Sequence, residues 1–222
     1  MTTELDRLKT LAQAEHNITT ENVRMLISNI STFFTKTLIQ AGHDQRQILR
    51  ITTKFRDAGR RSPPWRPASG RVPGRPQDGA DGNRRKRWLF EQEHKFYANE
   101  KDATLTEVKY YLQALSMTGA PDLPPDSIQD CFVWLVGHRV IPGEYYDPIQ
   151  LIPINLTEVL EQARDIQSGH LIPLDRGGRH EPSNAFLMLA RSNQLQGNLT
   201  LDELLALLQR ILQRHRERGH IS

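Results

Sequence analysis

The residues best suited to chemistry lie near the end of this 222-residue chain, between Asp165 and Asn198. His170 is followed by Asn184 fourteen residues later, and by Asn193 nine residues after that. An imidazole with an unperturbed pKa of about 6.5 is partly neutral near pH 7, so it can accept a proton from water. Taken singly, a histidine and an asparagine are most simply hydrogen-bonded structural residues. The interpretation therefore depends on how these residues are arranged.

Short elements surround these residues and must position them. Two apolar runs, 166–174 and 185–190, have the length of β-strands, and the loop between them contains Gly177 and Gly178. A helical segment follows the second run. Thr200-Leu-Asp-Glu203 has the form of a capping box, and it opens an amphipathic helix. The apolar side of that helix consists of Leu204, Leu205, Leu208, Ile211 and Leu212. The predicted order is strand, loop, strand, helix.

This order, with the spacing of His170, Asn184 and Asn193, resembles the HNH endonucleases, also called ββα-metal nucleases. The resemblance covers about residues 165–212. The family pattern is commonly written as Asp-His-Ile-x-Pro, a Gly-Gly loop, His-x-x-x-Asn, an apolar strand, and an Asn or His before a Lys-Gly or Gln-Gly ending. The matching segments are His170-Leu-Ile-Pro173, Gly177-Gly178, His180 to Asn184, Phe186 to Leu189, and Asn193 to Gly197. Agreement at this many fixed offsets makes the pattern specific.

The resemblance implies a role for each patterned residue. Hydrolysis of a phosphodiester needs an activated water, a cation that offsets charge on the phosphate, and stabilisation of the leaving oxygen. By the resemblance, His170 is the general base of catalysis. Asn193 would place its amide oxygen on Mg²⁺, for which Mn²⁺ can substitute. Asn184 would tie the loop between the strands and thereby orient the strand that carries His170.

The chain departs from the family pattern at the residue before the base. Family members often have an aspartate there as a second metal ligand, whereas this chain has Gly169. Asp165, Asp175, His180 or an extra water would have to complete the site. Asp165 is a poor candidate, because at 3.3 Å per residue a strand separates it from residue 169 by about 13 Å. The sequence does not decide between the others.

A second departure concerns cysteine. Many family members bind a structural zinc ion through paired cysteines, but this chain has a single cysteine, Cys131. No structural zinc is expected, and Cys131 lies in an apolar run where burial is the usual fate. We therefore expect the nuclease unit to be stabilised by apolar packing of Phe186, Leu187, Leu189 and the final helix.

The positive charge of the chain is concentrated in one stretch. Residues 56–87 carry a formal charge of +7, whereas the whole chain carries only +3. The same stretch is rich in proline and glycine, so we expect a long basic loop over 58–87. This loop is either a solvated tether or a segment that binds along a polyanion. In the second case its arginines would contact phosphates and Trp65 would stack on a base. The predicted DNA-binding residues are Arg60, Arg61, Arg84, Arg85, Arg87, Arg176, Arg179 and Arg191. For the last three, simple solvated charge is an equal alternative.

The rest of the chain is predicted to be mainly helical. Apolar residues recur at three- and four-residue spacings before the basic loop and again from Trp88 to Met117, which predicts packed helices. We predict four regions: a helical N-terminal region (1–57), the basic loop (58–87), a helical DNA-recognition region (88–150) and an HNH nuclease domain (151–222). The expected fold class is α+β, mostly helical, with a C-terminal ββα-metal finger.

Composition excludes several classes of protein. Hydrophobic residues make up 37% of the chain, the mean hydropathy is -0.57, and no apolar run approaches the roughly 20 residues that span a bilayer. The first twenty residues lack the apolar region of a secretory signal. With one cysteine, these features predict a cytoplasmic protein that does not enter membranes.

The sequence therefore predicts a divalent-metal-dependent DNA endonuclease. Its size and basic loop resemble those of a sequence-specific type II restriction enzyme that cuts double-stranded DNA as a homodimer. Two alternatives remain open at this point. One is a phage or mobile-element nuclease that nicks a single strand, and the other is a DNA-binding protein whose nuclease finger has lost activity, as Gly169 suggests.

Overall fold

The structure, a computed structural model, describes residues 4–63, 84–124 and 127–221. In these ranges it is mostly helical and has a small sheet of two antiparallel strands, which agrees with the α+β class. Much of the predicted basic loop, including Trp65, Arg66, Arg71 and Arg75, lies outside the described residues. The described ends of that loop meet at an isolated antiparallel bridge between Arg61 and Lys86.

Four helices form the larger part of the molecule. They are α1 (Glu4–Ala12), α2 (Thr20–Gln40), α3 (Gln45–Arg60) and α4 (Glu100–Leu115). The side chains of Thr19, Asp44 and Asn99 each accept a hydrogen bond from the first turn of α2, α3 and α4 respectively, so each helix starts at a polar cap. The helix α3 runs through Gly59 to Arg60 and thus extends slightly into the predicted loop.

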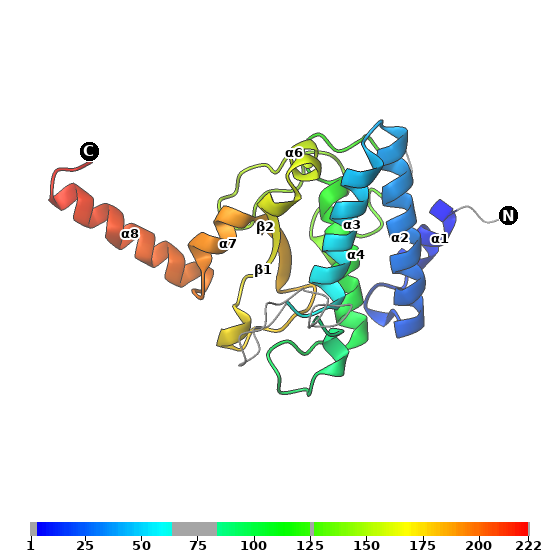
Figure 1. Cartoon of the computed structure of the whole chain (residues 1–222), viewed down its shortest axis with the longest axis horizontal. Coiled ribbons are helices and arrows are strands. Elements are labelled where there is room, and N and C mark those ends of the chain that lie inside the picture. Colours follow the sequence, from blue (N-terminus) through cyan, green and yellow to red (C-terminus); the bar gives the residue numbers. More distant parts are fainter. Residues whose placement is uncertain (1–3, 64–83, 125–126, 222) are drawn as a thin grey trace.

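The helix α4 lies at the centre of the molecule. It packs against α2, α3 and the second strand, and every residue from Ala103 to Leu115 is buried (Figure 1). Its polar side chains therefore need partners inside the protein. Lys109 donates to the carbonyl of Pro182 at 2.5 Å, and the Gln113 side chain accepts from the backbone amide of Leu187 at 3.1 Å. The central helix thus anchors the segment that contains the patterned residues.

One hydrophobic core joins the predicted regions. The rings of Phe34, Phe55 and Tyr111 meet edge to face at centroid distances of 5.2 to 6.1 Å. The same core includes Leu135 from the region 88–150 and Leu187 from the C-terminal region. Burial of these side chains in a shared core couples the helices to the sheet, so the site is held by the whole helical body.

The C-terminal region contains the predicted hairpin. The strands β1 (Ile166–His170) and β2 (Ala185–Leu189) pair antiparallel, with Ile166 opposite Leu189 and His170 opposite Ala185. The helix α7 (Ala190–Gln196) follows directly. The first strand is shorter than predicted, because the chain turns after His170 and forms a 3₁₀ helix, η5, at Leu174–Arg176.

Shorter helices connect these parts. The α-helices are α5 (Val133–Val136) and α6 (Leu156–Glu161), and the 3₁₀ helices are η1 (Glu15–Asn17), η3 (Arg87–Leu89) and η4 (Ala163–Asp165). The prediction of helix over 88–117 is wrong for residues 90–99, since η3 ends at Leu89 and α4 begins only at Glu100. Among the helices of the described residues, none is both long enough and apolar enough to cross a membrane.

The final helix differs from the expectation. The helix α8 (Leu201–Glu217) begins with the predicted capping box, in which Thr200 and Glu203 exchange hydrogen bonds. It then extends away from the body of the molecule (Figure 1). Leu204 is buried, but Leu205 and Leu212 are 46% and 47% exposed. The expectation that this helix packs into the core is therefore wrong beyond its first turn, because the remaining turns lie outside the body.

Candidate active site

The two faces of the hairpin point to different parts of the molecule. Because side chains alternate along a strand, Ser168 and His170 share one face, and Gln167 and Gly169 share the other. Ser168 hydrogen-bonds Tyr110 of α4, so the first face is directed toward the helical body. Gln167 accepts a hydrogen bond from Asn193 of α7 at 2.7 Å, so the second face is directed toward α7.

On the first face, His170 belongs to a chain of hydrogen bonds. Its Nε2 lies 2.9 Å from Nδ1 of His180, and Nε2 of His180 lies 2.7 Å from the carbonyl oxygen of Gly59 at the end of α3. A carbonyl can only accept, so Nε2 of His180 must donate. With His180 neutral, its Nδ1 is then an acceptor and Nε2 of His170 donates to it. The proton of His170 is thereby fixed on Nε2, and its Nδ1 keeps a lone pair.

Burial and a neighbouring charge keep both rings neutral. Burial, and secondarily the positive charge of Arg87, lowers the pKa of His170 to about 3. The same two causes, in the same order, hold the pKa of His180 well below its usual range. Each imidazole is therefore uncharged near pH 7, as the hydrogen-bond chain requires. We call these three groups, His170, His180 and the Gly59 carbonyl, the histidine relay.

Arg87 occupies the interior beside the relay. It is only 3% exposed, and its guanidinium donates to the carbonyls of Gly59, Ala58 and Phe96 at 3.0 to 3.4 Å. The same Gly59 oxygen accepts from His180. The expectation that Arg87 contacts DNA is not supported, because backbone carbonyls use its donors and burial removes it from solvent.

The loop between the strands is held by Asn184. Its side-chain oxygen accepts from the amide of Ile172 at 2.8 Å, and its nitrogen donates to the carbonyls of Ile172 and Arg179 at 2.9 and 2.8 Å. Gly178 passes so close that an added Cβ would lie 1.9 Å from the Ile172 oxygen. No side chain fits there, so the glycine is required for close approach. Asn184 thus connects both ends of the loop that carries His180.

Asn193 lies on the opposite face of the hairpin from His170. Its amide nitrogen bonds Gln167, and the neighbouring Met188 is fully buried on that same face. A Cβ at Gly169 would come within 2.3 Å of the Met188 sulfur. The methionine therefore fills the space beside Gly169 where the family pattern has a carboxylate. In the described part of the chain, His170 is thus hydrogen-bonded to His180 and Asn193 to Gln167, on different faces of the hairpin.

These residues do not fit a magnesium ion as they are arranged. Mg²⁺ prefers octahedral oxygen ligands, commonly with one or two carboxylates. Within the described ranges no group of three or more histidine, cysteine, aspartate or glutamate side chains could hold a metal. Asp175 pairs with Lys95 at 2.6 Å, His180 is buried in the relay, and the Asp165 side chain is 61% exposed beside Arg164. None of these three joins Asn193.

The other arginines predicted to bind DNA lie in varied surroundings. Arg85, Arg179 and Arg191 are exposed. Arg176 is tied to Glu203 through two contacts at 2.8 and 3.1 Å, which fixes η5 to the start of α8. Of the predicted basic-loop arginines, Arg61 and Arg84 lie 3.7 and 3.5 Å from the same carboxylate, that of Asp57. The exposed members remain available to a polyanion.

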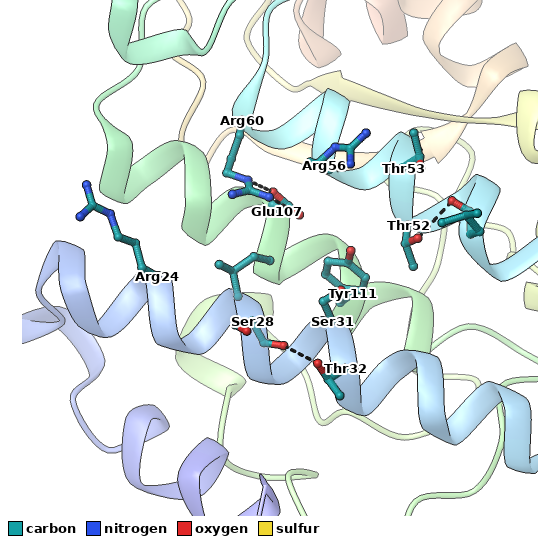
Figure 2. Close-up of a pocket in the computed structure, with 12 residues that line it drawn as sticks. Arg24, Ser28, Ser31, Thr32, Thr52, Thr53, Arg56, Arg60, Glu107 and Tyr111 are labelled. Carbon is teal, nitrogen blue, oxygen red and sulfur yellow. Dashed lines mark hydrogen bonds and ion pairs between the residues drawn. The ribbon is translucent and has the colours of Figure 1, made fainter. Parts of the chain in front are cut away.

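Arg60 lies in a groove of about 460 Å³ between α2 and α3 (Figure 2). Arg24 and Arg56 also line the groove, together with apolar and aromatic side chains and with five aliphatic hydroxyl groups, those of Ser28, Ser31, Thr32, Thr52 and Thr53. On its floor the buried Glu107 pairs with Arg60. Burial raises the pKa of Glu107 to about 6, against the opposing effect of Arg60. Guanidinium and hydroxyl donors in one groove favour a phosphate oxygen as ligand.

Sequence reasoning missed several residues that shape the site. From the sequence, His180 was either a loop residue that helps Asn184 or a group that completes the metal site. Its hydrogen bond to the carbonyl of Gly59 joins positions 121 apart in the chain. Lys109 lies 3.3 Å from the ring centre of Phe186, and burial lowers its pKa to about 7. The ten-residue spacing of His170, at the end of β1, and His180, in the loop that follows, was a usable signal. The long-range contacts, such as that between His180 and Gly59, leave no signal in a single sequence.

Comparisons with known proteins add limited information. No protein-family match is found, and no curated protein matches. Among solved structures, the crystal structure of a type II restriction endonuclease aligns with a TM-score of 0.46 and 20% sequence identity. The alignment covers 55% of this chain and 55% of that chain. The chain thus matches about half the length of this structural neighbour.

Proposed function

We propose that this chain is a DNA endonuclease whose catalytic unit is formed by β1, the following loop, β2 and α7. The observation that carries the proposal is the histidine relay in a segment that has the residue pattern of the HNH endonucleases. The relay fixes the tautomer of His170 and leaves its Nδ1 lone pair without a partner in the described part of the chain. The free lone pair is what a proton acceptor needs, and the lowered pKa of His170 means that it becomes an effective base only when a bound negative charge raises that pKa.

In this proposal the chain's own residues perform the proton transfer. Nδ1 of His170 takes a proton from the water whose oxygen bonds to phosphorus, while the bond from phosphorus to the leaving oxygen breaks and that oxygen takes a proton from solvent water. The resulting imidazolium is stabilised through its Nε2 donor by the neutral acceptor nitrogen of His180. A bound phosphodiester also raises the pKa of His170, because an adjacent negative charge favours the protonated form.

A divalent cation remains part of the proposal as a requirement to be tested. When bound, Mg²⁺ or Mn²⁺ would offset charge on the phosphate and the leaving oxygen. Asn193 is the oxygen donor that the sequence pattern assigns to it. Because the observed donors do not form a magnesium site, no step of the reaction is assigned to the metal here.

The proposed substrate is double-stranded DNA, cut at a specific sequence in the manner of type II restriction enzymes. Two exposed guanidinium groups belong to the catalytic unit itself, those of Arg179 in the loop between the strands and Arg191 in α7. The groove with Arg56 and Arg60 would bind a further backbone phosphate. Phosphate contacts of this kind set affinity and orientation but not sequence preference.

A second candidate function is DNA binding without cleavage. The packing of Met188 against Gly169 favours it, because this space is where the family pattern has a carboxylate ligand. A protein of this kind would keep the basic surface and the folded hairpin while lacking the metal chemistry.

One experiment separates these candidates. The purified chain is incubated with supercoiled plasmid in Mg²⁺, in Mn²⁺ or in EDTA, and binding is measured in parallel by gel shift. The proposal expects broken DNA with a divalent cation and intact DNA in EDTA. A linear product indicates double-strand cleavage, and an open circle indicates the nicking alternative. Binding without breaks in any condition supports the second candidate, and absence of binding contradicts both.

A further inference from the structure

The outer part of α8 has an apolar stripe that the described residues leave uncovered. Leu205, Leu208, Ile211 and Leu212 are between 39% and 47% exposed, although they lie on one side of a continuous helix. The buried Leu204 fixes the first turn of the helix to the body. Large apolar side chains gathered on one exposed face are typical of a protein interface. The helix extends outward, so another molecule can reach this face (Figure 1).

The spacing along α8 is that of a helix pair. The exposed Leu205, Leu208 and Leu212, and then His215, follow alternating steps of three and four residues, the repeat of a two-helix seam. The helix has 17 residues, which corresponds to about 25 Å at 1.5 Å per residue. A partner helix of the same length would cover the stripe along its whole exposed part.

Charge along α8 identifies the partner. The first turn contains Asp202 and Glu203, whereas the last turns contain Arg214, Arg216 and Arg218. Asp202, Gln209 and Arg216 recur at seven-residue intervals, so they lie on the same flank of the stripe. In an antiparallel pair of identical helices this flank faces itself. Asp202 of each copy then lies opposite Arg216 of the other, with Gln209 at the centre.

We infer that α8 is a homodimerisation helix, which pairs antiparallel with α8 of a second copy about a two-fold axis near Leu208 and Gln209. In this arrangement Leu205 of one copy meets Leu212 of the other. Parallel pairing would instead place the arginine-rich ends side by side, which like-charge repulsion disfavours. The inference does not depend on the proposed nuclease activity, because it uses only the exposed face and the charges of α8.

The expected affinity follows from the size of the surface. A helix of about 25 Å presents less area than the ~800 Å² per partner of a standard interface. We therefore expect a dimer that dissociates when the protein is diluted into the low micromolar range. The chain has a mass of 25.5 kDa, so the dimer has twice that mass.

Sedimentation velocity of the full chain between about 1 and 100 µM, supported by light scattering, tests the inference. The mass should rise from monomer to dimer with concentration. The variant Leu208→Glu/Leu212→Glu should remain monomeric, while Ala206→Glu/Gln213→Glu, which adds the same charge on the opposite face, should dimerise like the wild type. Circular dichroism of each variant verifies that α8 is still helical. A wild type that is monomeric throughout, or a dimer that survives Leu208→Glu/Leu212→Glu, overturns the inference.

A charge exchange tests the antiparallel orientation. Each of Asp202→Arg and Arg216→Asp places like charges at both ends of the pair and should weaken dimerisation by about tenfold, since both exposed ion pairs are removed. The double variant restores both pairs in reversed order and should recover most of the affinity. If the double variant is weaker than either single variant, the antiparallel arrangement is wrong.

Discussion

The histidine relay makes the stability of the protein depend on pH in a specific way. In the unfolded chain His170 should titrate near its ordinary pKa of about 6.5. Burial and Arg87 lower the pKa in the folded protein to about 3. Between these values the unfolded state binds a proton that the folded state does not, so folding stability falls as pH falls. The contribution is fully present above about pH 6.5 and is lost progressively toward pH 3.

The magnitude can be worked out for a convenient pH. One unit below the unfolded pKa, at pH 5.5, protonation of His170 stabilises the unfolded state by roughly 1.4 kcal/mol, and at pH 4.5 by roughly 2.7 kcal/mol. The value at pH 5.5 requires only that the pKa in the folded protein is well under 5.5. His180 adds a loss in the same direction, because its pKa is also lowered by burial.

Urea denaturation of the wild type and of His170→Gln at pH 7.5 and 5.5 measures this effect. The wild type should lose roughly 1.4 kcal/mol more than the variant between the two pH values. The control is His43→Gln, in the turn between α2 and α3, which should show the full wild-type loss. An equal loss in wild type and His170→Gln would refute the buried neutral state of His170.

Three further predictions concern the loop and the basic surface. Replacing Asn184 with Ala removes three partly buried hydrogen bonds to the backbone, so it should cost about 2–3 kcal/mol of unfolding free energy in urea titrations. Gly178→Ala should lower the free energy of unfolding by at least ~2 kcal/mol, because the added Cβ would collide with the Ile172 carbonyl. Gly177→Ala should lower it by only ~1 kcal/mol, because the added Cβ meets open space and only the φ of +84° is unfavourable. The opposite order of the two glycine variants would be inconsistent with the close approach at Gly178. Finally, Arg84→Ala/Arg85→Ala should weaken DNA binding. The slope of log affinity against log salt concentration should become less steep by nearly one unit for each phosphate that is no longer neutralised. An unchanged slope would mean that these arginines do not contact phosphate.

The hairpin was predictable from the sequence because its determinants are local. The two apolar runs, the Gly-Gly pair and the spacing to Asn184 act within about twenty residues, and the structure has two strands at Ile166–His170 and Ala185–Leu189. The capping box at Thr200 is similarly local, since donor and acceptor are three residues apart. Its sequence pattern therefore located the start of α8 correctly.

The central helix was harder to delimit. The helix α4 is buried on every side, so its sequence lacks the apolar and polar alternation that marks an amphipathic helix. Glu107 and Lys109 are polar in sequence yet buried, because Arg60 and the carbonyl of Pro182 are partners that only the fold supplies. For α8 the error was the opposite one: its apolar stripe predicted burial in the core, but most of the stripe is exposed. An apolar face predicts that it will be covered but not which surface covers it.

The chemistry of the site could be predicted only in part. The sequence identified His170, Asn184 and Asn193, but the face on which each side chain lies depends on strand register and on the contacts of α4 and α7. The relay to Gly59 and the buried charge of Arg87 join segments far apart in the chain. Such contacts follow from tertiary packing, which no local pattern encodes.

The central claim is that His170 is the proton acceptor in DNA hydrolysis. The most direct test compares the cleavage rate and the DNA affinity of wild type, His170→Ala and the control His43→Ala on plasmid in the presence of Mg²⁺ or Mn²⁺. The account predicts that His170→Ala abolishes cleavage while it binds DNA almost as tightly as the wild type, and that the control cleaves normally. Cleavage by His170→Ala at the wild-type rate, or an intact plasmid with the wild type, would contradict it.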